Sequence, residues 1–100
     1  MAELCLTLLC PSTVEEKLLD VLLMLPGATV FTSVKIAAHG LHAARLSDAE
    51  QVLGRAISTQ VQVVFAEADK ETVFATIQDQ FAGVGLRYWL TPVIEAGEFK

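Results

Sequence analysis

The sequence predicts a single α+β domain in which strands and helices follow in the order strand, helix, strand, strand, helix, strand. Short apolar runs of strand length alternate with two segments whose apolar residues recur every three or four positions. The chain has 100 residues, enough for one hydrophobic core. Of these residues, 53% are apolar and only 19% are charged, against about 25% charged in typical domains. A domain this small cannot hide that much apolar surface alone, which favours a partner that covers part of it.

The first half of the chain predicts a strand over residues 3–10 and a helix that ends at Pro26. Pro11 bounds the strand, because proline cannot donate a hydrogen bond to a strand ladder. Two overlapping capping boxes, in which a hydroxyl and an acid three residues later satisfy free backbone N–H groups, predict the start of the helix. They lie in the stretch Ser12-Thr13-Val14-Glu15-Glu16.

The second half repeats this order after a second strand over residues 29–37. A long connection over residues 38–54 contains a further capping box that predicts a short helical turn. The third strand, residues 55–66, shows alternating apolar and polar side chains, and Asp69 caps a second helix. The last strand covers residues 86–94.

Two such βαβ halves, placed side by side with right-handed crossovers, give the ferredoxin-like βαββαβ arrangement. This is a four-stranded antiparallel sheet with two helices on one face. The alternation predicts that Leu4, Leu6, Leu8, Ile57, Val61, Val63 and Phe65 face the helices. The uncovered face would then carry Cys5, Thr7, Leu9, Phe31, Ser33, Lys35, Ser58, Gln60, Gln62, Trp89 and Thr91.

The predicted uncovered face combines aromatic and apolar side chains with neutral polar ones, which is the composition of a protein interface. We therefore expect closed homo-oligomerisation through the sheets. The alternative is a solvent-exposed face with scattered apolar residues. The face also depends on strand parity, which a bulge would reverse.

Charge and composition exclude several classes of protein. Twelve acidic and seven basic residues give a net charge of −5, so the basic surface that nucleic-acid binding requires is absent. The sequence has neither a Lys/Arg run for anionic lipid nor an apolar stretch long enough to insert into a membrane. Without a secretory signal, the expected location is the cytoplasm. Cys5 and Cys10 lack CxxC spacing and are read as buried reduced thiols, with a redox pair or metal ligands as the alternative.

The chain resembles PII-like signalling proteins in its element order and in the long connection at 38–54, which stands where that superfamily carries its partner-binding T-loop. More narrowly, it is similar to a small bacterial PII-like family of unassigned function that is often encoded near heavy-metal efflux systems. The residues that carry the narrower match are Leu8-Leu9-Cys10-Pro11, Phe31-Thr32-Ser33, His39-Gly40, Ser47, Glu50-Gln51-Val52, Gly54-Arg55, Tyr88-Trp89 and Pro92-Val93.

The resemblance implies a homotrimer whose sheets pack inside and whose long loops dock onto a protein partner, here a membrane transporter of the efflux type. The predicted partner-binding loop contains His39, Gly40, His42, Arg45, Glu50 and Gln51. ATP binding does not carry over. Nucleotide-binding PII proteins have a longer glycine-rich loop with an acid and a lysine before the last strand, whereas this chain has Gly83-Val84-Gly85 with Arg87 as the nearest cation.

Two ligand sites are predicted from the residues. His39 and His42, with Asp48 or Glu50 or with neighbouring subunits, form a candidate site for a divalent metal. Two histidines alone are too few ligands for such a site, so a solvated loop or a partner contact is the alternative. A candidate anion or effector cleft between subunits consists of Lys35, Gly54, Arg55 and Arg87. The alternative for Lys35 and Arg55 is contact with an acidic partner surface.

The chain is not expected to be an enzyme. It contains no Asn, which removes the Arg-plus-Asn arrangement of acylphosphatases on this fold, and it lacks a nucleophile elbow. Three functions stay open. They are a trimeric PII-like regulator that binds an effector or metal, a metal-binding or metal-buffering protein that uses the loop histidines, and a structural subunit without a ligand.

Overall fold

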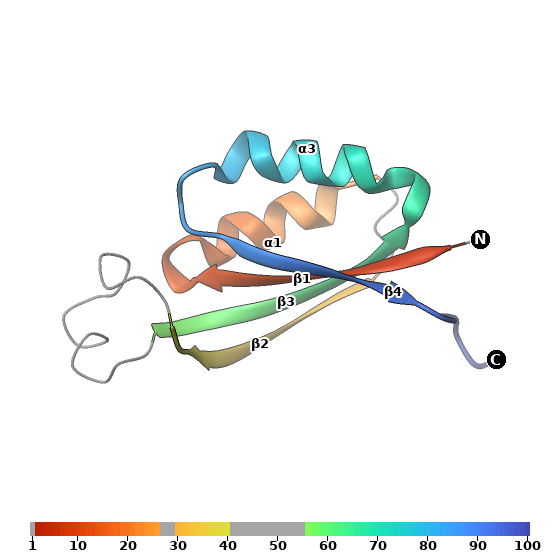
Figure 1. Cartoon of the computed structure of the whole chain (residues 1–100), viewed down its shortest axis with the longest axis horizontal. Helices are drawn as coiled ribbons and strands as arrows, with labels where there is room; N and C mark the ends of the chain where they lie inside the picture. Colours follow the sequence, from red (N-terminus) through yellow and green to blue (C-terminus); the bar gives the residue numbers. More distant parts are fainter. Residues whose placement is uncertain (1, 27–29, 41–55) are drawn as a thin grey trace.

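The protein is a two-layer α+β domain with a four-stranded antiparallel sheet under two helices (Figure 1). The computed structural model describes residues 2–26, 30–40 and 56–100. The elements are β1 (Glu3–Pro11), a 3₁₀ turn (Ser12–Val14), α1 (Glu15–Met24), β2 (Val30–Ala38), β3 (Ala56–Ala66), a second 3₁₀ turn (Glu67–Asp69), α3 (Lys70–Phe81) and β4 (Arg87–Val93). The strand order is β2-β3-β1-β4. The predicted ferredoxin-like arrangement is confirmed, and each described strand boundary lies within one residue of its predicted position.

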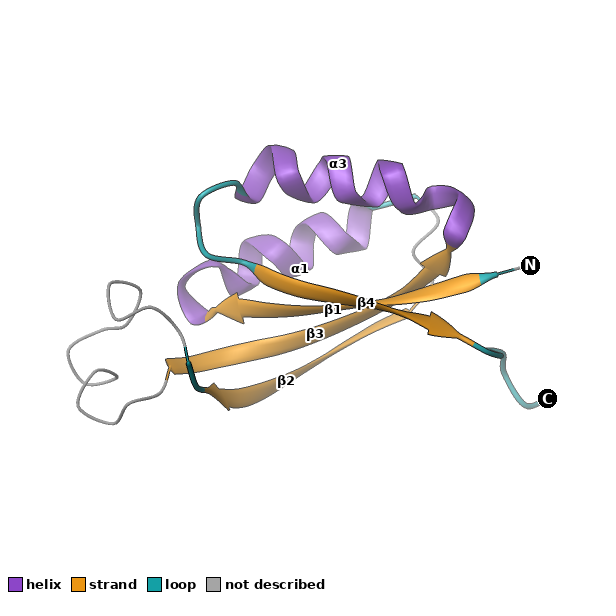
Figure 2. Cartoon of the chain, viewed as in Figure 1, coloured by secondary structure: helices purple, strands orange, loops and turns teal. Residues whose placement is uncertain are grey.

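The hydrophobic core lies between the sheet and the helices, which both cover the same side of it (Figure 2). The alternate apolar side chains of the two central strands point into this layer. Leu6 and Leu8 of β1 are 1% exposed, and Phe65 of β3 is fully buried. They pack against Leu18 and Leu22 of α1 and against Val73 and Phe81 of α3, together with Val61 and Val63.

The predicted parity of β1 and β3 is confirmed over most of their length. Ile57 has the predicted parity but is not buried: it lies on the helix side, as Val61 does, yet it is 54% exposed. It lies near the start of β3, at the end of the sheet from which residues 41–55 depart. The helices do not reach this end of the strand.

The start of α1 does not use the predicted capping boxes. Its N-cap position is Val14, and neither α1 nor the preceding 3₁₀ turn has a side-chain cap hydrogen bond. The carboxylate of Glu15 instead accepts a hydrogen bond from Thr59 of β3. The Glu15 carboxylate, which the predicted capping box would use to cap the helix, thus forms a tertiary contact with β3 instead. Asp69 does occupy the N-cap position of α3, but it also makes no side-chain cap bond.

The side of the sheet away from the helices is uncovered, and we call it the open face. The register of the ladders assigns its members. They are Glu3, Cys5, Thr7 and Leu9 of β1, Val30, Thr32, Val34 and Ile36 of β2, Ser58, Gln60, Gln62 and Val64 of β3, and Arg87, Trp89, Thr91 and Val93 of β4. The predicted assignments for β1, β3 and β4 agree with this register.

The predicted parity of β2 is wrong. Phe31 pairs with Val63, and Lys35 pairs with Thr59, so Phe31, Ser33 and Lys35 lie on the helix side. Directly opposed residues of an antiparallel pair share a face. The open face of β2 therefore carries Val30 and Val34 in their place, with exposed fractions of 67% and 55%.

The reason is that β2 is an edge strand whose helix side is only partly covered. Phe31 packs against the core, but Ser33 and Lys35 on the same side are exposed. The usual rule that the apolar set of a strand faces the helices fails here, because the apolar set of β2 faces away from them. The open face is consequently more apolar than the sequence predicted.

Candidate functional site

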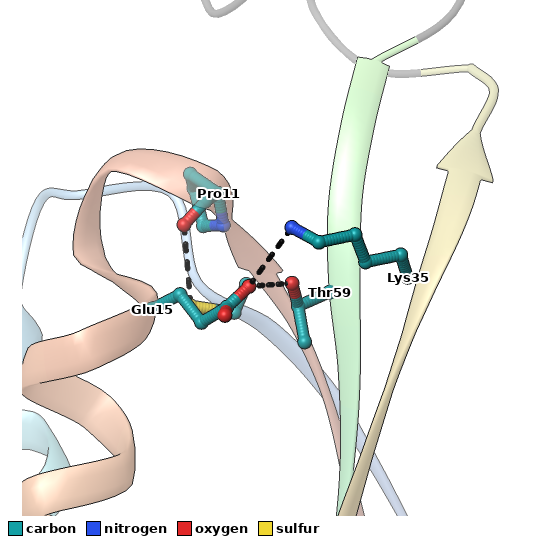
Figure 3. A network of polar contacts seen from close by, with 5 residues as sticks. Pro11, Glu15, Lys35 and Thr59 are labelled. Carbon is teal, nitrogen blue, oxygen red and sulfur yellow. Dashed lines mark hydrogen bonds and ion pairs between the residues drawn. The ribbon is translucent and has the colours of Figure 1, made fainter.

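A polar cluster lies at the end of the sheet from which residues 41–55 depart. It is formed where β1 gives way to α1, beside the C-terminal half of β2 and the first half of β3. Figure 3 shows Glu15, Thr59 and Lys35 pointing toward one another from these three elements. The Glu15 carboxylate accepts the Thr59 hydroxyl hydrogen, and its oxygen lies 3.8 Å from Lys35 Nζ.

The burial of this cluster is graded. Thr59 is 2% exposed, the Glu15 side chain is 25% exposed, and the Lys35 side chain is 74% exposed. The hydrogen bond between Thr59 and Glu15 is therefore the structural contact, whereas an ion pair so exposed on the lysine side contributes little to stability. Most of the Lys35 side chain is therefore accessible to solvent or to a ligand.

Cys10 lies beneath this cluster as a buried thiol. Its Sγ donates to the carbonyl oxygen of Pro11 at 3.3 Å, and its side chain is 0% exposed. Burial, and secondly the negative charge of Glu15, raise the pKa of Cys10 to about 11. The group is a protonated thiol at neutral pH, in agreement with the reading of Cys10 as a small buried hydrophobe. Cys5 on the open face is also a free thiol and is half-buried.

The residues predicted for the anion cleft do not meet within one chain. Lys35 lies on the edge strand β2, on the helix side, and Arg87 lies on the opposite edge strand β4, on the open face. Three strand spacings, roughly 14 Å, separate the two edges. The other two members, Gly54 and Arg55, lie outside the described residues. A cleft that uses Lys35 and Arg87 together requires two subunits, and it stays a prediction.

The predicted partner-binding loop is described only at its beginning. His39 follows the end of β2 and is exposed, and Gly40 has φ of 77°, a left-handed conformation that favours glycine. The predictions for His42, Arg45, Glu50, Gln51 and the short helical turn near Ser47 lie outside the described residues.

The predicted metal site is likewise described only in part. Within residues 2–26, 30–40 and 56–100, no three His, Cys, Asp or Glu side chains are grouped so that they could hold a metal ion. His39 is described and His42 is not, so the histidine pair stays a prediction.

Sequence reasoning missed Val30 and Val34 as members of the open face. No pattern in the sequence identifies them, because Val30, Val34 and Ile36 share one parity and the usual rule directs such an apolar set toward the helices. With that parity, the open face carries charge only at Glu3 and Arg87 among the residues assigned to it above. Trp89, 47% exposed, lies between Thr7 and the free edge of β4.

Neither described helix is long and apolar enough to cross a lipid bilayer.

The chain matches one family over its whole length, the proteins of unknown function called DUF3240, at residues 1–100. No curated protein matches it significantly. A solved DUF3240 family protein from Shewanella baltica OS155 is similar, with a TM-score of 0.83 at 15% identity over 100% of this chain and 99% of that one. A Bacillus cereus protein related to NIF3 has a TM-score of 0.73 at 13% identity, with 97% of this chain but only 26% of that one covered.

Two further similar structures are a PII-like protein and a GlnK–ATP complex. A putative PII-like signaling protein from Thermus thermophilus has a TM-score of 0.66 at 15% identity, over 93% of this chain and 88% of that one. The Bacillus subtilis GlnK–ATP complex has a TM-score of 0.58 at 10% identity, over 92% of this chain and 82% of that one. At these identities the likeness concerns the fold, which is thus shared with PII-like proteins.

Proposed function

The chain belongs to the DUF3240 family of proteins of unknown function, and from its PII-like fold and its open face we propose that it is a homotrimeric regulatory protein of the cytoplasm. In this proposal three copies pack their open faces against one another. The connection after β2 docks onto a protein partner, and a small effector or metal controls the docking. The role requires no catalysis.

The observation that carries the proposal is the composition of the open face. Val30, Val34 and Trp89 are exposed there by 67%, 55% and 47%. A sheet face that meets water carries charged side chains at such positions. Among the strand residues assigned to this face, only Glu3 and Arg87 are charged. They belong to the first and the last residue pair of the ladder between β1 and β4. An apolar centre with charge at its rim is the pattern of an interface between subunits.

Assembly is tested with two neighbouring residues of β2 that face opposite sides. Val34→Lys places a charge on the open face, and Ser33→Lys places the same charge on the helix side, where Ser33 is already exposed. Light scattering coupled to size exclusion should give a trimer for the wild type and for Ser33→Lys, and a monomer for Val34→Lys. A monomeric wild type at micromolar concentration contradicts the proposal.

Docking is tested separately, with residues 41–53 replaced by a Gly-Ser linker of equal length. We propose a heavy-metal efflux transporter as the partner, as the family resemblance implies. The wild-type trimer should co-purify with the cytoplasmic part of the transporter, and the linker variant should remain a trimer but lose this association. Equal association of both proteins contradicts a docking role for the connection.

The effector cleft at the subunit boundary would combine Lys35 and Arg55 of one copy with Arg87 of the next. The exposure of Lys35 and the separation of Lys35 from Arg87 within one chain support this division between subunits. Double substitution Lys35→Gln/Arg87→Gln should abolish binding of an anionic effector without changing the trimer. An unchanged affinity removes both cations from the site.

The alternative function is metal binding or buffering by His39 and His42. It is favoured by the exposure of His39 beside Gly40, within the part of the chain that the structure describes. Calorimetry with Zn²⁺, Cu²⁺ and Ni²⁺ should show binding to the wild type that is lost in His39→Ala/His42→Ala. Equal binding by both proteins excludes the histidines as ligands.

A further inference from the structure

A cavity of about 400 Å³ lies between α3 and the edge strand β4, on the helix side of the sheet. Its floor is formed by Leu6 and Leu8 of the central strand β1, and its walls come from α3 and from the start of β4. In Figure 1 the chain leaves the end of α3, turns, and returns along β4, so that both walls belong to one helix–turn–strand unit. The lining residues are Leu6, Leu8, Phe74, Ala75, Ile77, Gln78, Phe81, Leu86 and Tyr88.

The lining is apolar and aromatic, with two polar groups. The rings of Phe74 and Tyr88 meet edge to face with centroids 5.2 Å apart, and Tyr88 is 57% exposed. Gln78 contributes an amide, and Tyr88 contributes a hydroxyl. A concave apolar site of a few hundred cubic ångströms with a small number of polar groups is the usual form of a small-molecule site.

The charges around the cavity argue against an anionic ligand. Among the described residues that line it, none is Asp, Glu, Lys, Arg or His. Lys17 stands over the Phe81 ring at 5.2 Å but already donates to the carbonyl oxygen of Gln80 at 3.3 Å. Lys70 stands over Phe74 at 5.7 Å but lies beside Asp69 and Glu71 at the acidic start of α3. A polyphosphate or a multiply charged metabolite would find no unopposed cation among these described residues.

We infer that this cavity is a binding site for a small, uncharged, largely aromatic molecule with one hydrogen-bonding group. That group would form a hydrogen bond with the Gln78 amide or the Tyr88 hydroxyl. A ring that enters beside Phe74 and Tyr88 completes an aromatic cluster and removes the exposed face of Tyr88 from water. That this molecule acts as a second effector of the regulator, besides the anion proposed for the subunit cleft, rests on the proposed function. Its binding does not, because every lining residue belongs to one chain.

The test uses N-phenyl-1-naphthylamine, an uncharged aromatic amine whose fluorescence rises in apolar surroundings, with the full chain. Its titration should saturate at one probe per chain, and equimolar ATP should not displace it. Tyr88→Ala removes one wall and should weaken binding about tenfold. Trp89→Ala is the matched control, because Trp89 is the next residue of β4 and points to the open face. It should leave probe affinity within about twofold.

Light scattering on the same two variants separates this inference from the proposed function. Trp89→Ala should weaken the trimer and leave the affinity for the probe unchanged. Tyr88→Ala should leave the trimer unchanged and weaken the binding of the probe. Probe binding that does not saturate, that ATP displaces, or that Trp89→Ala weakens as much as Tyr88→Ala overturns the cavity assignment. In case Tyr88→Ala fails to fold, NMR of the wild type gives the second reading. The probe should shift the side-chain signals of Phe74, Ile77 and Leu86, and unshifted signals overturn the assignment.

Discussion

The Thr59 hydroxyl donates a hydrogen bond to the Glu15 carboxylate, and this contact ties the start of α1 to the first half of β3. The two residues are 44 positions apart in the sequence, and Thr59 is 2% exposed. Because the donor is buried and the Glu15 carboxylate is only partly exposed, the loss of this bond has a measurable energy.

Thr59→Val should lower the free energy of unfolding by about 1–3 kcal/mol, since it preserves the shape of the side chain but leaves Glu15 without its buried donor. Thr76→Val is the matched control, because the Thr76 hydroxyl bonds to the Thr72 carbonyl on an exposed helix surface at 2.9 Å. That substitution should cost less than about 0.5 kcal/mol. Urea denaturation of both variants measures the difference. Equal decreases in the free energy of unfolding would show that the bond to Glu15 stabilises the fold no more than the exposed helix bond does.

Leu22 and Leu23 are neighbours in α1 with opposite environments. Leu22 is 1% exposed in the core and Leu23 is 70% exposed. Leu22→Ala should lower the free energy of unfolding by about 2–5 kcal/mol, because it leaves a cavity beneath the helix. Leu23→Ala should change it by less than about 0.5 kcal/mol. A large effect of Leu23→Ala would mean that a partner or a second copy covers this helix face.

The two cysteines should differ in reactivity toward a thiol reagent such as 5,5′-dithiobis(2-nitrobenzoic acid). Cys10 is fully buried with its pKa raised to about 11, whereas Cys5 is half-buried on the open face. At pH 8, and at a protein concentration low enough to dissociate the trimer, Cys5 should react first, and Cys10 should react only at the rate of unfolding. Cys5→Ser isolates the Cys10 rate. Fast modification in that variant contradicts the burial of Cys10.

The raised pKa of Cys10 also predicts a loss of stability in alkali. The folded state holds the thiol proton up to about pH 11, whereas the unfolded thiol releases it near its ordinary pKa of 9.0. Between these two pH values deprotonation lowers the free energy of the unfolded state relative to the folded state, so the free energy of unfolding falls by about 1–3 kcal/mol in total. Cys10→Ala should reduce this decline between pH 9 and 11, as urea denaturation at each pH would show. An identical pH dependence in the variant would assign the decline to other groups.

Trp89 is the single tryptophan of the chain and gives a direct signal from the open face. If three copies bury this face, its emission should shift to longer wavelength on dilution, in step with the loss of trimer mass. Val34→Lys should show the shifted emission at every concentration. An emission maximum that is independent of concentration while the mass changes would place the subunit contact elsewhere.

The fold was predictable because periodicity is a local property that the helices and strands retain. β1 and β3 alternate strongly, and the structure follows their pattern at Leu6, Leu8, Val61 and Phe65. Parity in β2 was not predictable by the same rule. The rule assumes that apolar side chains seek the helices of their own chain, and Val34 instead lies on the side that such helices do not reach.

The candidate sites were less predictable, because they depend on distances between residues remote in sequence. Glu15 has the spacing of a capping residue, yet it is engaged by Thr59 and Lys35 from two other elements. The cavity beside Tyr88 arises from how α3 crosses β4, and helix periodicity does not specify that crossing. Chemistry at such places follows from tertiary packing, and sequence spacing alone does not determine it.

Strand β1 occupies an inner position of the sheet, where it pairs with β3 on one side and with β4 on the other. Its partner across the second ladder is the last of the described strands to leave the ribosome, as the pairing of Glu3 with Val93 illustrates. The first of these strands to be made must therefore wait, with one hydrogen-bonding edge unsatisfied, until β4 has emerged. Such long-range closure slows folding and leaves a nascent chain that is prone to aggregate. Cells that produce this protein in quantity should depend on chaperones at the ribosome exit.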